Sequence, residues 1–209
     1  SSRKNINGEL DMSEEKEACS IILKSKENLG AAFDVYKSID GTKNKLLNKF
    51  RNDLETEMES LGFHLIWDEN LASNCKKEIG FGIKFHKEQN IYLKFVFEYS
   101  GLDRFFWGIG RESKSIQANP DIWAKIHNLM SIQFGNDKKS EDWWPWYSAT
   151  TNNGLDVDIR DWSKDELPWT MILDNGDNRL AKRISKLAYR VYKAFEGNEK
   201  LLAASSSLV

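Results

Sequence analysis

Residues 79–111 read IGFGIKFHKEQNIYLKFVFEYSGLDRFFWGIGR, and this stretch decides the fold. Apolar and polar residues alternate there in three runs, which is typical of strands with one buried face. The two breaks between the runs, residues 86–90 and 100–104, have the length and composition of hairpin turns. We therefore predict a three-stranded antiparallel meander over residues 79–111.

One face of this meander carries large apolar side chains, because successive side chains point to opposite faces of a strand. A wall of this kind has to be covered by another layer of the protein. Its members are Ile79, Phe81, Ile83, Phe85, Ile91, Leu93, Phe95, Phe97, Tyr99, Phe105, Trp107 and Ile109.

The other face is rich in glycine. Gly80 and Gly82 on the first run, and Gly108 and Gly110 on the third, would flank a central strand with larger residues. Glycine inside a strand usually marks a bend, a bulge or the close approach of another group. The sequence leaves open whether a helix packs closely here, whether the strands bend, or whether the face forms a shallow groove for a ligand or partner chain. The larger central residues are Tyr92, Lys94, Val96 and Glu98.

Helical patterns precede the meander. Two helical stretches are predicted within residues 13–38, and Asp40-Gly41-Thr42 is expected to end the second one. A third and stronger helix ends at Gly62, a residue that commonly terminates helices. Its buried stripe is Leu47, Phe50, Leu54, Met58 and Leu61.

Further elements are predicted on both sides of the meander. Residues 63–67 form a short strand, and Asn119 begins a helix with proline in its first turn. A second hairpin is expected at about residues 144–160, because Asn152-Asn153-Gly154 is a turn sequence. Residues 163–166 form a capping box, and the last helix covers about residues 177–195.

These elements predict an α+β fold. We expect a mainly antiparallel sheet of four to six strands, with helices covering it and an N-terminal helical segment. The expected division is a partly mobile helical segment at residues 1–40, an α+β domain at residues 41–197 and a tail at residues 198–209.

Composition narrows the class of protein. The hydrophobic fraction of 40% and the charged fraction of 30% are typical of a soluble globular protein. A net charge of -2 gives the whole chain no electrostatic signature of nucleic-acid binding. Cys19 and Cys75 lie far apart, which favours a reducing, cytoplasmic compartment. No run approaches the length of a membrane span, so we expect no membrane partner.

Motifs for nucleotide and metal chemistry are not found. Gly80-Phe81-Gly82 and Gly108-Ile109-Gly110 lack the remaining residues of a phosphate loop. His64, His86 and His127 have no His or Cys at ligand spacing. We therefore expect no cofactor and no metal. The sequence favours a binding protein over an enzyme.

Two acidic sequence patterns are candidates for metal sites. Asp156 and Asp158 could share a cation if they alternate on a strand, or they could form a solvated strand edge. Glu14-Glu15-Lys16 matches the Glu-x-Lys of two-metal nucleases, but it lies in a helical pattern with no strand before it. We interpret this match as chance.

The best candidate for recognition is aromatic. Trp143, Trp144, Trp146 and Tyr147 offer the large contact area that dominates binding hot spots, and such rings also stack on bases or sugars. Packing in a hydrophobic core is the alternative for these side chains. Tyr92 and Arg111 would supply positioned polar groups beside them.

The last helix provides a second candidate surface. Lys182, Lys186, Arg190 and Lys193 recur at helical spacing opposite its apolar stripe. These cations could contact phosphates, or they could form a solvated helix face.

The order of these elements resembles a known group of proteins. A helix ending at Gly62 precedes a strand at residues 63–67 and the meander, and Trp123, residues 143–147 and Trp162 follow. The pattern over roughly residues 40–195 is similar to the C-terminal region of bacterial PD-(D/E)XK nuclease superfamily proteins. The catalytic acid and Glu-x-Lys strand of that family have no counterpart here.

The resemblance implies a module that accompanies a catalytic domain, with a role in bacterial defence. We therefore predict a non-catalytic binding or sensing module whose partner is a protein or an upstream catalytic domain. A nucleic-acid-binding accessory domain and a Mg²⁺-dependent nuclease fragment are the alternatives.

Overall fold

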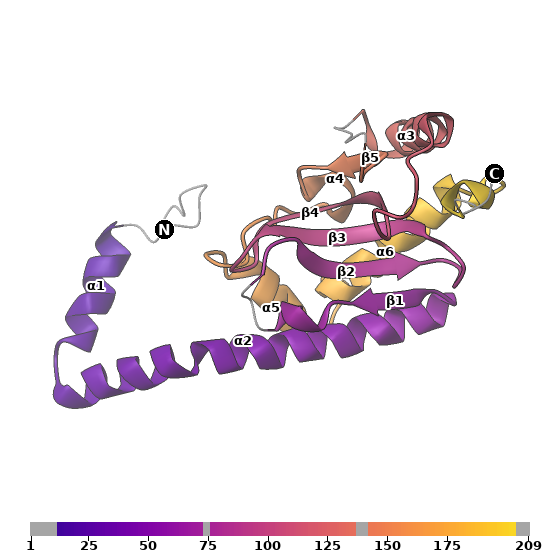
Figure 1. Ribbon diagram of the computed structural model, residues 1–209. Coiled ribbons are helices and arrows are strands. Elements are labelled where there is room, and N and C mark those ends of the chain that lie inside the picture. Colours follow the sequence, from indigo (N-terminus) through magenta and orange to yellow (C-terminus); the bar gives the residue numbers. More distant parts are fainter. Residues whose placement is uncertain (1–11, 73–75, 137–141, 204–209) are drawn as a thin grey trace.

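The computed structural model describes residues 12–72, 76–136 and 142–203. It confirms the α+β class: helices pack against a single five-stranded antiparallel sheet (Figure 1). Each strand pairs with its neighbours in chain order. The strands are β1 (His64–Trp67), β2 (Ile79–Lys84), β3 (Ile91–Tyr99), β4 (Asp103–Arg111) and β5 (Trp146–Ser148).

The meander has the register that its residue pattern predicts. Lys94 of β3 lies between Gly82 of β2 and Gly108 of β4, and Tyr92 pairs with Gly110. The glycine pairs therefore flank the bulkier central strand, as expected. At its two edges the meander gains β1, which pairs with β2, and β5, which pairs with β4.

Helix α1 (Met12–Ile22) is followed by the much longer helix α2 (Lys26–Leu61). The Ser25 side chain accepts a hydrogen bond from the backbone N–H of Asn28, which caps the start of α2. Gly62 ends α2 in the left-handed conformation, with a φ of 73°.

The expected helix break at Asp40-Gly41-Thr42 is wrong, since α2 is continuous through these residues. The Thr42 hydroxyl donates to the carbonyl of Ser38 one turn earlier and so stays within the helix. One exposed glycine costs a helix only about 1 kcal/mol, which does not end a helix anchored by a buried stripe further along. The two expected segments, residues 1–40 and 41–197, are thus joined by one helix.

The N-terminal half of α2 and α1 extend away from the sheet (Figure 1). No side chain is buried between residues 14 and 40, whereas Leu47, Phe50 and Leu54 further along α2 are fully enclosed. The hydrophobic core therefore begins at about residue 47.

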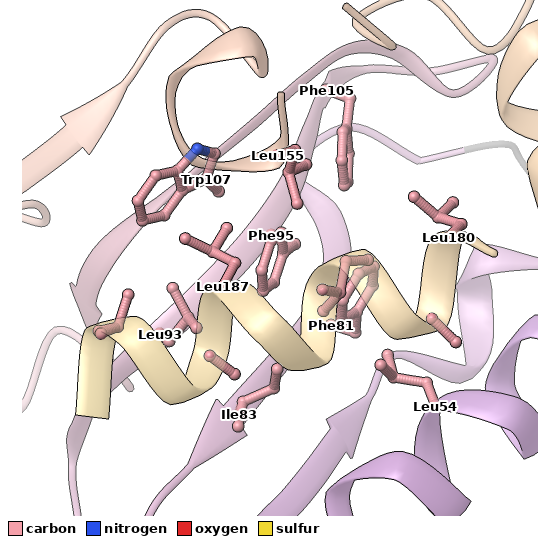
Figure 2. Close-up of a cluster of buried hydrophobic side chains, with 14 of the residues drawn as sticks. Leu54, Phe81, Ile83, Leu93, Phe95, Phe105, Trp107, Leu155, Leu180 and Leu187 are labelled. Carbon is pink, nitrogen blue, oxygen red and sulfur yellow. The ribbon is translucent and has the colours of Figure 1, made fainter. Parts of the chain in front are cut away.

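The apolar face of the sheet is covered by helices. Phe50 of α2 packs edge-on against Phe81, with ring centroids 5.5 Å apart. Helix α6 (Leu180–Ala194) runs across the same face, and Figure 2 shows Leu187 among the side chains of Phe95 and Trp107. The apolar stripe of the last helix faces the core and is buried: Leu180, Ile184, Leu187, Ala188, Val191 and Phe195.

The expected second hairpin at residues 144–160 is wrong. Only β5 is a strand, and the short helix α4 (Asn152–Leu155) follows it. This segment is held by side-chain contacts and not by pairing with another strand. The buried Thr151 hydroxyl accepts a hydrogen bond from the backbone N–H of Ile159. Gly154 lies so close to the ring of Trp107 that a Cβ there would come within 2.8 Å of it.

The remaining helices complete the layer around the core. They are η1 (Glu69–Leu71), α3 (Pro120–Phe134), α5 (Leu167–Leu173) and η2 (Glu199–Leu202). Asn119 caps α3 as predicted, but α5 begins at Leu167 rather than at the expected capping box. Within the described residues, no helix has the length and apolar character needed to cross a membrane.

Candidate functional site

The glycine-rich face of the sheet forms a groove of about 650 Å³. A groove was one of the three alternatives that the sequence left open for this face; that it holds a ligand or a partner chain stays a prediction. Strands β3 and β4 form its floor, and the segment leading into β5 forms one wall. Its lining residues are Glu78, Lys94, Val96, Glu98, Arg104, Phe106, Glu112, Trp143, Trp144, Tyr147, Ala149 and Arg160.

Two glycines make room for aromatic rings on this face. A Cβ at Gly82 would lie 2.3 Å from the ring of Tyr92, so that ring packs directly against the glycine. A Cβ at Gly110 would lie 3.0 Å from the ring of Trp144 and from the stem of Lys94. The close approach that glycine permits is therefore made by the protein's own aromatic side chains.

The aromatic segment after α3 is held against the edge of β4. The backbone N–H of Arg111 donates to the carbonyl of Trp143 over 3.1 Å, and Tyr147 pairs with Gly108. Strand alternation then sends Tyr147 to the groove and Trp146 to the opposite face. Trp146 is fully buried in the core and its indole N–H donates to the carbonyl of Gly135. Trp146 therefore does not belong to the binding surface for which it was a candidate.

Phe106, Trp144 and Tyr147 form an apolar wall of the groove. Their rings meet edge to face, with centroids 5.2 Å apart for Phe106 and Trp144 and 5.7 Å apart for Phe106 and Tyr147. Each ring is only partly buried, so apolar surface stays open to a ligand.

Lys94 places its ammonium group at the aromatic end of the groove. Its Nζ lies 5.5 Å from the ring centre of Tyr92, 5.8 Å from that of Trp143 and 5.6 Å from that of Trp144. These distances are typical of cation–π contacts. It also donates to the backbone carbonyl of Arg111 over 3.2 Å. Desolvation lowers the pKa of Lys94, while the carboxylates of Glu112 and Glu78 act in the opposite direction.

Tyr92 and Arg111 stand behind the groove lining. Both are nearly buried, with 5% and 8% of their surface exposed. Arg111 donates to the carbonyl of Ile116 and its guanidinium lies 4.8 Å from the ring centre of Trp143, which supports that ring from behind. Burial, with a smaller contribution from Glu112, raises the pKa of Tyr92 to about 12.

Most charges at the rim of the groove are neutralised within the protein. Arg104 pairs with Glu98 at 3.1 Å, Lys84 pairs with Glu112 at 2.8 Å, and Arg160 pairs with Asp158 at 2.8 Å. Lys94 has no ion pair within the described residues, and neither does Glu78 on the β2 side. Lys94 and Glu78 are therefore the charged lining residues that lack an ion pair in the described part of the chain.

The basic residues of α6 lie far from this groove in the fold, on the helix-covered side of the sheet. Lys182 reaches Glu57 at 3.5 Å and Lys193 reaches Glu196 at 2.8 Å, so two of the four cations are already in ion pairs. Arg190 lies 4.9 Å from the ring centre of Phe134, and Lys186 is exposed.

The acidic candidates do not converge on a common point. Asp158 pairs with Arg160 and its pKa is lowered by that hydrogen bond, and Asp156 follows α4 rather than lying on a strand. In the part of the chain that the structure describes, no three His, Cys, Asp or Glu residues are placed to hold a metal ion. Glu14 and Lys16 lie on α1, away from the sheet, while Cys75 lies outside the described residues.

Sequence reasoning singled out the aromatic residues and placed Lys94 on the glycine-rich face, but it assigned no binding role to Lys94, Phe106 or Glu78. A signal for Lys94 was present: it is the one cation in the middle of the strand that the glycine pairs flank. No such signal marked Glu78, whose place depends on how the chain enters β2.

Comparison with known proteins adds no relative: no family model, curated protein or solved structure matches this chain. The fold and the groove define an α+β protein whose antiparallel sheet is covered by helices on one face and carries a groove on the other. The resemblance to the nuclease superfamily stays a prediction from the sequence.

Proposed function

We propose that this protein is a binding module that holds a small ligand, or a ligand-sized part of a partner, in the groove on the glycine-rich face of its sheet. The observation that supports this proposal is that two regions from different parts of the sequence meet at one groove. The aromatic segment at residues 143–147 and the glycine-rich face of the meander line one and the same groove.

The dimensions and chemistry of the groove support this function. Ligand pockets usually enclose about 300–1,000 Å³ and combine an apolar lining with a few positioned polar groups. The groove has a volume of about 650 Å³, a wall of three aromatic rings, and the ammonium group of Lys94 beside that wall.

A binding role is favoured over catalysis by the partners of the polar groups. General acid–base and nucleophilic catalysis depend on reactive side chains that hydrogen-bond one another. Here Lys94 donates to a backbone carbonyl, and the groove acids Glu98 and Glu112 pair with Arg104 and Lys84. A wider role beside a nuclease-like catalytic domain in defence rests on the sequence resemblance alone.

The test is ligand-observed NMR with a set of fragment-sized compounds, comparing the wild type with Trp144→Ala. We expect compounds that bind the wild type to lose their signal changes with Trp144→Ala, because that ring forms the wall. Ile132→Ala is the matched control, since Ile132 is 76% exposed on α3 and lies outside the groove lining.

Thermal unfolding of both variants checks that the fold is kept. Binding that is equally strong in the wild type and in folded Trp144→Ala would contradict the proposal.

A further inference from the structure

We infer that the groove selects ligands that carry an anionic group next to a flat apolar body, with the anion held by Lys94 and the body against Phe106, Trp144 and Tyr147. This inference rests on the proposed binding function and adds the chemical class of the ligand.

The first argument is the hydrogen-bonding capacity of Lys94. A lysine ammonium group has three N–H donors, and the carbonyl of Arg111 accepts one hydrogen bond from it. The three aromatic rings nearby attract its charge but accept no conventional hydrogen bond. A carboxylate or phosphate oxygen entering the groove would form a charge-assisted hydrogen bond, which is about twice as strong as a neutral one.

The second argument concerns cationic ligands. Aromatic rings often bind ammonium ligands on their faces. Here those rings already have cations of the protein against them: Lys84 and Lys94 lie 5.3 Å and 5.5 Å from the ring centre of Tyr92, and Arg111 lies 4.8 Å from that of Trp143. At the aromatic end of the groove, a cationic ligand would compete with these protein cations for the rings of Tyr92 and Trp143. The positive charge of Lys94 would also repel it.

The third argument is the position of the remaining charges. Arg104 and Arg160 are ion-paired with Glu98 and Asp158, which leaves Lys94 as the groove cation without a carboxylate partner in the described residues. Glu112 acts electrostatically on Lys94, but its carboxylate pairs with Lys84 and forms no ion pair with Lys94. Glu78 is also in the lining and acts on Lys94 electrostatically. It would repel an anion that approached it, which favours an anion held between Lys94 and the aromatic wall.

The experiment uses three probes with one ring and three head groups: phenylacetate, 2-phenylethanol and 2-phenylethylamine. Dissociation constants are measured from chemical-shift titrations of the ¹⁵N-labelled protein, following the groove residues. We expect phenylacetate to bind about tenfold tighter than the alcohol, in keeping with one added charge-assisted hydrogen bond. The amine should bind weakest.

Two lysine variants test the source of this preference. Lys94→Met keeps the aliphatic stem and removes the charge, so phenylacetate and the alcohol should then bind equally. Lys94→Arg should keep the preference for the anion. Lys125→Met is the matched control, because Lys125 is exposed on α3 and lies outside the groove lining.

Equal binding of all three probes would overturn the inference and leave the proposed function standing. Tightest binding of the amine, a preference that survives in Lys94→Met, or no groove shift with any probe would also overturn it. The proposed function itself is decided separately, by the loss of fragment binding in Trp144→Ala.

Discussion

The ring of Tyr92 lies over Gly82 on the open face of the sheet, so closely that a Cβ at residue 82 would come within 2.3 Å of it. The glycine thus makes room for a ring whose centre lies 5.5 Å from the Lys94 ammonium group. Gly82 therefore makes room for Tyr92, although neither residue is in the groove lining itself.

Gly82→Ala should destabilise the protein by about 1–3 kcal/mol, the usual cost of adding a group to a filled site, because the ring of Tyr92 has to move away. Urea unfolding measures this free energy. Gly41→Ala is the control: Gly41 lies in α2 with nothing within 4 Å, so alanine there should stabilise the helix by up to about 1 kcal/mol.

Gly82→Ala can also be made in a variant that lacks the Tyr92 ring. In a Tyr92→Ala background, Gly82→Ala should cost much less, since the clash is with the removed ring. An unchanged cost in the two backgrounds would show that the strand backbone, not Tyr92, is what excludes a side chain at residue 82.

The stability supplied by Tyr92 should depend on pH. Burial raises the pKa of Tyr92 to about 12, whereas an unfolded tyrosine has a pKa near 10. The folded protein therefore keeps the proton over a range in which the unfolded chain loses it. The contribution is complete below about pH 10 and is lost as the pH rises towards about 12.

The measurement is the difference in unfolding free energy between the wild type and Tyr92→Phe. It should shrink by about 2 kcal/mol between about pH 9 and pH 12, as about two pKa units imply. Tyr36→Phe is the control, because Tyr36 is 75% exposed. A difference that stays constant for Tyr92→Phe would mean that this phenol is well hydrated in the folded state.

Thr151→Val should lower the unfolding free energy by about 1–3 kcal/mol. The Thr151 side chain is fully buried, and without its hydroxyl the N–H of Ile159 would lose its acceptor. Thr56→Val, on the exposed side of α2, should stay within about 0.5 kcal/mol of the wild type. Equally small changes in unfolding free energy for Thr151→Val and Thr56→Val would indicate a different conformation for residues 149–160.

A chain that starts at residue 41 should keep the fold. Every described side chain from residue 14 to residue 40 is exposed or only partly buried, so its removal should change the unfolding free energy by less than about 1 kcal/mol. Circular dichroism and urea unfolding check this. Unfolding of the shortened chain would show that the N-terminal segment stabilises the domain through contacts of its own.

The sheet was predictable from the sequence because strand periodicity is local. Each apolar residue of the meander wall from Ile79 to Phe97 and from Phe105 to Ile109 is buried, and the register follows from two short turns. The same reasoning failed at residues 152–159. There the spacing of Leu155 and Ile159 matches the apolar pattern of a strand. The conformation is instead determined by tertiary contacts of Thr151 and Gly154.

Only part of the groove was predictable from the sequence, because its other residues come together through strand pairing. Aromatic residues near β5 stand out in a sequence, but which face each ring occupies depends on strand pairing. Trp146 and Tyr147 are neighbours, and pairing with β4 buries the first and opens the second to the groove. The role of Lys94 depends on its distance from three rings, which no local pattern contains.

The most direct test of the central claim is a map of backbone amide shifts on titration with compounds found to bind. If the open sheet face is the binding surface, the shifts will centre on the lining residues Lys94, Phe106, Trp144 and Tyr147. Shifts centred on α6 around Lys186 and Arg190, with the sheet amides unchanged, would contradict the account.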